Sequence, residues 1–313
     1  MLVGDANARE AAAPAAHPLL GTAARLSAMD ERIRFSARTP AEAGWVSLSA
    51  ASARETVAGW LDELPTSGTG MRNVAGARVG LSLACCIVRP LMATLHIEQR
   101  VPVLTPDSVF VRRARSQFVE FAVAPTEVYA LARDPEIGHP ALHTVPDVPQ
   151  LLEQSAHSLY WTLAPVLNAV RAEGRYGLRH LWGGVLDMIG ATSLLAARLG
   201  GLPQQLVWRR AEQLCELVYS RSEQPKVRYP TPFAVNYAGG DALFTVKGTC
   251  CLQYREPGLR AGEQDEHGTA YCETCPFLRE DTRLRRCAST AERDVKLLGE
   301  RGVGDCGGCA QLN

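Results

Sequence analysis

The stretch NVAGARVGLSLACCIVRPLMATLH, residues 73–96, decides the fold class of this 313-residue chain. It is long, strongly apolar and helical in character, and it predicts a helix that kinks or breaks at Pro90. Its most apolar part, residues 80–88, is too short to cross a membrane and lies between Arg78 and Arg89. We therefore expect a core helix of a globular protein.

The segments around this run predict a mainly helical α+β body with a small antiparallel hairpin or meander. Apolar residues recur at three- and four-residue spacing in the expected helices, whereas apolar and polar residues alternate in the expected strands. The expected helices are residues 52–64, 149–172, 178–199 and 203–220. The expected strands are residues 101–104, 108–113, 117–123 and 242–246.

We divide the chain into three parts. Residues 1–65 form an N-terminal leader and helix, and residues 66–245 form the helical α+β body. Residues 246–313 form a small cysteine-rich C-terminal module with a tail, because seven of the ten cysteines follow residue 249.

Charge and cysteine content exclude several classes of protein. The 33 basic and 33 acidic residues cancel, so the chain lacks the excess of cations that non-specific nucleic-acid binding or a polybasic membrane patch needs. The N-terminal residues show no basic region followed by an apolar one, so we expect no signal peptide and a cytoplasmic protein. Clustered cysteines in a reducing compartment are more often metal ligands or redox groups than disulfides.

Two short motifs carry the chemistry: GTCCLQYR at 248–255 and YCETCPF at 271–277. Their four thiols are those of Cys250, Cys251, Cys272 and Cys275, and four soft thiolates are what a [2Fe–2S] cluster requires. Adjacent cysteines can bind one group only if the backbone turns sharply, which Gly248 could permit. Such a pair suits the tetrahedral geometry of a zinc site poorly.

This arrangement resembles the FhuF-type ferric-siderophore reductases, which bind a [2Fe–2S] cluster through a C-terminal Cys-Cys pair and a Cys-x-x-Cys. The words CCLQYR (250–255) and CETCP (272–276) look like the signature of that family. Residues 77–93 and 175–201 resemble its helical part more weakly, and that part is in turn similar to a domain of siderophore synthetases. The chain departs from the family in its longer connection, residues 256–271, and in having cysteines beyond the motif.

The resemblance implies an enzyme that gives one electron to ferric iron in an imported siderophore, for which a hydroxamate is a guess, and releases Fe(II) in the cytosol. The cluster would be held by Cys250, Cys251, Cys272 and Cys275, and the reaction needs no catalytic acid, base or nucleophile. No nucleotide-binding motif is present, so electrons would come from a separate ferredoxin or NAD(P)H-dependent reductase. Peripheral contact with a membrane transporter is compatible with this function.

Two other functions stay open. The first is a non-catalytic [2Fe–2S] protein, either an electron carrier or a sensor of iron or redox state, although the zero net charge disfavours a DNA-binding sensor. The second is a binding module stabilised by zinc.

The remaining candidates have weaker signals. Cys287, Cys306 and Cys309 could form a second metal site, with His267 as a further ligand, or act as alternative ligands or a redox-active disulfide. Arg255 could tune the cluster or touch the siderophore. We expect the cysteines that lie in apolar helical segments to fill the core as small apolar residues; these are Cys85, Cys86 and Cys215.

Overall fold

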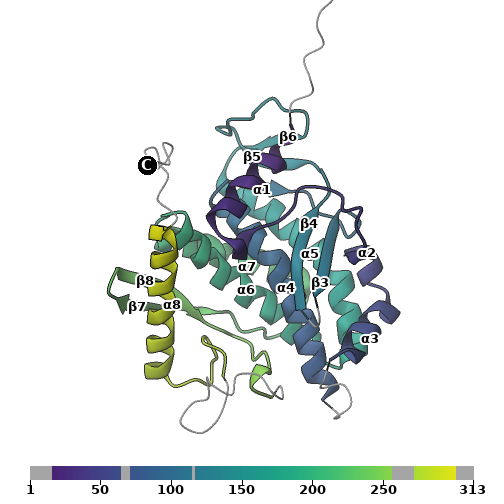
Figure 1. The fold of residues 1–313 in the computed structure, drawn as a ribbon, viewed down its shortest axis with the longest axis vertical. Helices are drawn as coiled ribbons and strands as arrows, with labels where there is room; N and C mark the ends of the chain where they lie inside the picture. The colour runs from purple at the N-terminus through teal and green to yellow at the C-terminus, as the bar shows by residue number, and fades with distance from the viewer. Residues whose placement is uncertain (1–15, 65–70, 115–116, 256–270, 301–313) are drawn as a thin grey trace, which may run out of the picture.

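The computed structural model describes residues 16–64, 71–114, 117–255 and 271–300. It confirms an α+β fold that is mainly helical, with small sheets at the edges of a helical core (Figure 1). The cysteines at 306 and 309 and the histidine at 267 lie outside the described residues.

Four long helices form the core. They pack against one another through leucine, valine, isoleucine and alanine side chains that are almost entirely withdrawn from solvent. Three of them coincide with predicted helices to within two residues at each end. The four are α4 (Arg72–His96), α5 (Val148–Gly174), α6 (Leu178–Leu199) and α7 (Gln204–Ser222).

Helix α4 contains the apolar run at residues 73–96. Of the kink or break predicted at Pro90, the break is absent, because the helix continues through this residue. The Thr94 hydroxyl donates to the Pro90 carbonyl at 2.9 Å. It is the one described helix long and apolar enough to span a membrane, but most of its surface is buried inside the protein. Burial of this kind is typical of a core helix.

Two small sheets flank the helices. The predicted hairpin is confirmed: β3 (Val109–Ala114) and β4 (Gln117–Val123) are antiparallel, and β1 (Trp45–Ser47) pairs with β3. In the second sheet, β5 (Val128–Leu131) lies between an antiparallel and a parallel neighbour. Those neighbours are β2 (Arg100–Pro102) and β6 (Leu142–Val145).

The N-terminal part contributes short helices. The helix predicted for residues 52–64 is found as α3 (Arg54–Asp62), and a separate one-turn helix, α2 (Leu48–Ala51), precedes it. Helix α1 (Pro18–Met29) precedes them and leads into a 3-10 turn, Glu31–Ile33, that packs on α4.

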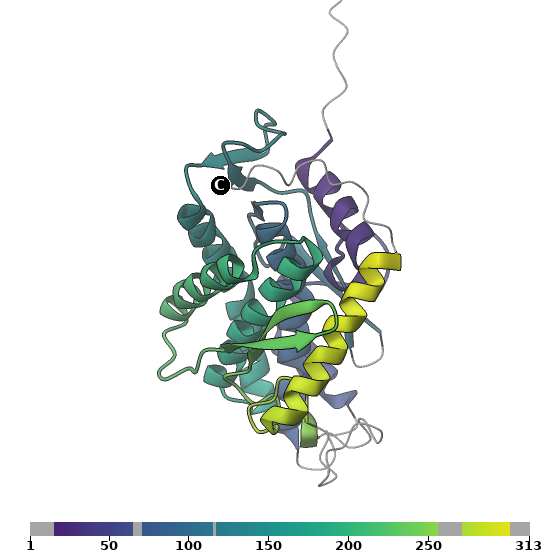
Figure 2. The ribbon, with the colours of Figure 1, turned by 90° about the vertical axis from the view of Figure 1, so that its left-hand side faces the viewer.

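The C-terminal part is a hairpin covered by a helix. Strands β7 (Thr231–Tyr237) and β8 (Gly240–Val246) are antiparallel, and α8 (Glu280–Glu300) lies across them (Figure 2). The sequence predicted the end of β8 but neither β7 nor α8. Asp294 on α8 forms ion pairs with Arg198 of α6 (3.2 Å) and with Arg32 (2.8 Å), which join α8 to the helical body.

Helices α4 and α5 approach closely enough for their backbones to touch. A Cβ added at Gly76 of α4 would lie 2.8 Å from the carbonyl oxygen of Gly174, the last residue of α5. Only glycine at this position leaves the two backbones in contact, and this contact sets the spacing of the helices.

We therefore expect Gly76→Ala to lower the free energy of unfolding by about 1–3 kcal/mol, because the added methyl group must push two backbones apart. Gly59→Ala is the matched control, because Gly59 lies on the exposed side of α3 and an added Cβ there would have no neighbour within 4 Å. Alanine's better helix propensity should make that variant neutral or more stable by up to about 1 kcal/mol. Urea denaturation measures both, and equal losses in the two variants would contradict the packing argument.

Candidate functional site

The four motif cysteines lie on two segments, and three of them pack together. Cys250 and Cys251 follow β8, and Cys272 and Cys275 precede α8. Cys272 and Cys275 are buried with Leu278, and Cys251 packs against them. The sulfurs of Cys251 and Cys272 are 3.7 Å apart.

The backbone turn at the adjacent pair is made by Leu252. Its φ of 57° is in the left-handed region, which is strained for a residue with a branched side chain. Gly248, which we expected to make this turn, does not have a positive φ in the structure. Its role is a close approach, because an added Cβ would lie 2.3 Å from the carbonyl oxygen of Arg228.

The CxxC segment is a tight turn held from both sides. The amide of Cys275 donates to the carbonyl of Cys272 at 3.0 Å. On one side, the Lys247 amide donates to the Thr274 carbonyl at 3.0 Å. On the other, Arg283 of α8 donates to the Cys275 carbonyl at 3.2 Å. Strand β8 and helix α8 thus fix the turn between them.

Helix α6 anchors the Cys-Cys segment. The buried carboxylate of Asp187 accepts hydrogen bonds from the amides of Gly248 (2.7 Å) and Thr249 (3.1 Å). One helical turn earlier, Gly183 gives Thr249 room, because an added Cβ would lie 2.1 Å from its hydroxyl oxygen. The Tyr176 hydroxyl, from just before α6, donates to the Cys250 carbonyl at 2.6 Å. These contacts hold the pair against the helical body.

A lysine lies among the thiols. The Lys247 ammonium group is 3.5 Å from the Cys272 sulfur. Burial lowers the pKa of Lys247, but the neighbouring Cys272, Cys251 and Asp187 outweigh burial and raise it. Lys247 therefore stays charged, and its charge favours thiolates over thiols.

The thiols also act on one another. A hydrogen bond with Cys272, together with burial, raises the pKa of Cys251. A hydrogen bond from Cys272 lowers the pKa of Cys275, on which the charges of Cys250 and Cys251 also act. The four cysteines thus influence one another's pKa values, and the pKa of Cys275 is the one that is lowered.

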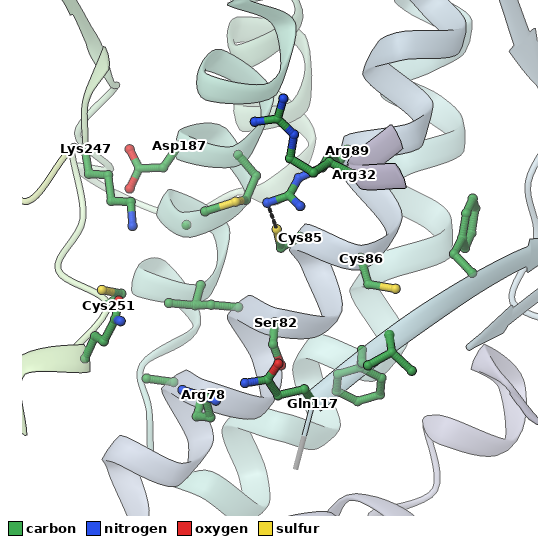
Figure 3. Close-up of a pocket in the computed structure, with 18 of the residues that line it drawn as sticks. Arg32, Arg78, Ser82, Cys85, Cys86, Arg89, Gln117, Asp187, Lys247 and Cys251 are labelled. Carbon is green, nitrogen blue, oxygen red and sulfur yellow. Dashed lines mark hydrogen bonds between the residues drawn. The ribbon is translucent and has the colours of Figure 1, made fainter. Parts of the chain in front are cut away.

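An open pocket of about 380 Å³ adjoins this group, and Cys251 lines it (Figure 3). Lys247 and Asp187 lie on the Cys251 side, and α4 forms the opposite wall with Arg89 and Cys85. The Arg89 guanidinium donates to the Cys85 sulfur at 3.1 Å. A ligand in this pocket would contact the surroundings of the thiol group directly.

The cysteines expected to fill the core have different outcomes. Cys215 is buried in the main core, which confirms the prediction. Cys86 packs against that core but is only half-buried. Cys85 is half-buried and lines the pocket with Cys86, so its surroundings are more polar than we predicted.

The weaker candidates stay predictions. Cys287 is fully buried in an apolar cluster with Val235, Phe244 and Ala291, and burial raises its pKa to about 12. The structure does not describe Cys306 and Cys309, so it does not test a second metal site. Arg255 is exposed at the end of the 3-10 turn Gln253–Arg255.

The donor set fits a soft metal group. Within the described ranges, no group of three or more His, Cys, Asp or Glu residues is already arranged to hold a metal ion. However, sulfurs bound to one tetrahedral metal at about 2.3 Å lie about 3.8 Å from each other, close to the spacing of Cys251 and Cys272. Cys251 and Cys272 are therefore spaced as two ligands of one metal would be, and Cys250 and Cys275 are the further thiols that the sequence predicts as ligands.

Comparison with known proteins does not assign the chain to a family. No protein-family model matches the chain, and no curated protein matches it.

Sequence reasoning missed the residues that surround the thiols. Lys247 is one of only three lysines in the chain, and Asp187 is the one acidic residue of the predicted helix 178–199. Both features can be read from the sequence, but neither indicates that the two side chains lie beside the cysteines. Arg89 had no signal beyond its place at the end of an apolar run.

Asp187 predicts a pH-dependent stability. Burial raises its pKa from 3.8 to about 7, so in metal-free protein the folded state keeps a proton that the unfolded state has released between about pH 4 and pH 7. We therefore expect the wild type to lose stability relative to Asp187→Asn as pH rises through this window. The difference between their free energies of unfolding should fall by roughly 4 kcal/mol at most. Urea denaturation at several pH values measures the difference. A difference that grows with pH would contradict the assignment.

Proposed function

We propose that the chain is a one-electron reductase that carries a [2Fe–2S] cluster on Cys250, Cys251, Cys272 and Cys275 and acts on ferric iron in a siderophore. The observation that carries this proposal is the packing of Cys251 against Cys272 and Cys275, beside an open pocket that Cys251 lines. Thiolates are the ligands of iron–sulfur clusters, and an adjoining pocket offers a place for a substrate.

When bound, a [2Fe–2S] cluster supplies one electron at a time, at a potential set by its surroundings. The chain's own residues would fix those surroundings. Asp187 holds the Cys-Cys segment, Arg283 holds the CxxC turn, and the Lys247 charge offsets the negative charge of four thiolates.

The electron balance of the proposed reaction is simple. One electron from an external donor, a ferredoxin or an NAD(P)H-dependent reductase, ends on the siderophore's Fe(III), which becomes Fe(II). Hard oxygen ligands hold Fe(II) less firmly than Fe(III), so the reduced metal leaves and the ligand is regenerated. The reaction breaks no covalent bond of the ligand, so it needs no nucleophile or general base.

The pocket favours a substrate over a purely structural or carrier role. An electron carrier needs an exposed edge near its cluster, not a pocket lined by Cys251 and by helices α4 and α6. A zinc module would use the same thiols, and metal analysis separates it from the reductase. We place the reaction in the cytosol, where peripheral contact with a membrane transporter would bring imported siderophore to it.

We expect protein purified without oxygen to contain about two iron and two acid-labile sulfide ions per chain, as a [2Fe–2S] cluster requires. Cys272→Ser or Cys275→Ser should abolish the normal cluster spectrum, because each removes a buried donor. Cys85→Ala, which removes a pocket thiol outside the four-cysteine group, should leave it intact. Zinc without sulfide in the wild type, or an unchanged spectrum in both serine variants, would refute the assignment.

Rapid mixing of the reduced protein with ferric siderophores tests the reaction itself. We expect the visible spectrum of the oxidised cluster to return, with one Fe(II) trapped by a ferrous-specific chelator for each electron lost. A protein that carries a cluster and is not reoxidised by any ferric siderophore would be a carrier or sensor instead.

A further inference from the structure

The pocket beside Cys251 is more cationic than the chain as a whole. Its lining includes five basic side chains and two acidic ones, in a protein whose formal net charge is zero. The basic residues are Arg32, Arg34, Arg78, Arg89 and Lys247, and the acidic residues are Glu31 and Asp187.

Some of these charges already have partners. Arg32 forms ion pairs with Asp30 (2.9 Å) and Asp294 (2.8 Å), so its charge is compensated within the protein. The Asp187 carboxylate accepts the amides of Gly248 and Thr249 and forms no ion pair with a pocket arginine among the described residues. The acidic groups therefore leave the guanidinium groups of Arg34 and Arg89 without an ionic partner among the described residues.

Arg89 is the least satisfied of the cations. It is half-buried on α4, and within the described structure its guanidinium has one hydrogen bond, to the Cys85 sulfur, while its Nε is buried with no partner. Arg34, on the exposed side of the same pocket, has no ion pair in the described residues. Leaving a buried guanidinium N–H unpaired is costly, and an anionic oxygen is the ligand that would satisfy it best.

We propose that this pocket selects ferric chelates of net negative charge, those whose iron is held by carboxylate or catecholate oxygens, over neutral hydroxamate complexes. The inference rests on the proposed function and names its substrate class. It replaces the hydroxamate guess with an argument from Arg34 and Arg89. The volume of about 380 Å³ lies at the small end of the range for ligand pockets, about 300–1,000 Å³, and so favours a compact chelate.

Redox-inert gallium complexes test the inference separately from electron transfer, because Ga(III) has the charge and nearly the size of Fe(III). Calorimetry on the full-length protein would compare anionic Ga(III)–citrate with the neutral Ga(III) complex of a ferrichrome-type hydroxamate. We expect the anionic complex to bind at least tenfold more tightly at low salt, with an advantage that shrinks as salt is added. Equal affinities, or no binding of either complex, would overturn the inference.

Charge-removing variants then assign the residues. Arg89→Gln should weaken binding of Ga(III)–citrate about tenfold and Arg34→Gln several-fold, while binding of the neutral complex stays the same. Arg209→Gln is the matched control, because Arg209 is an exposed arginine of α7 outside the pocket lining. Arg34 is exposed as well, so its variant keeps the test valid if Arg89→Gln does not fold. An effect of Arg209→Gln as large as that of Arg34→Gln would overturn the site.

The two proposals fail in different ways. If the protein is reoxidised by ferric siderophores but shows no preference for negative charge, the inference is wrong and the reductase stands. If the charge preference and its arginine dependence are found in a protein that does not reduce ferric complexes, the pocket is assigned and the reductase is refuted.

Discussion

The carboxylate of Asp187 is the contact on which the candidate site depends. It lies in the middle of α6, is almost completely buried, and accepts the amides of Gly248 and Thr249. A carboxylate withdrawn from water is costly unless it is hydrogen-bonded, and these two amides supply the bonds. In return, the segment that carries Cys250 and Cys251 is fixed to the rigid helical core.

Two basic residues lie near the segment that Asp187 holds, one beside the cysteines and one at the pocket. Lys247 lies among the thiols, where its ammonium group contacts the Cys272 sulfur, and Arg89 faces the pocket from α4. The first compensates charge that thiolates would bring, and the second is available to a ligand. Cys251 belongs to the cysteine group and also lines the pocket. A chelate bound in the pocket would therefore lie next to the cysteines.

The helices α5, α6 and α7 could be predicted from sequence because their buried apolar residues recur at helical spacing along the chain. The helix α8 could not. Its sequence is dominated by charged residues, and it is held by the few that pack on the β7–β8 hairpin and by the ion pairs of Asp294. The chain stays helical at Pro90, where the sequence predicts a kink or a break, because α4 is packed on several sides, which compensates for the hydrogen bond that proline cannot donate.

The sequence by itself determined the kind of donor: four thiols in two short motifs, in a neutral chain with a mainly helical body. It could do so because the two motifs are defined by the types of residue and their spacing within short stretches of sequence. Only the tertiary structure decided what surrounds those thiols. Lys247, Asp187 and Arg89 come from a strand end and two helices far apart in sequence, and only packing brings their charges to one site. The strained turn at Leu252, rather than at Gly248, is likewise set by the contacts that hold both ends of the segment.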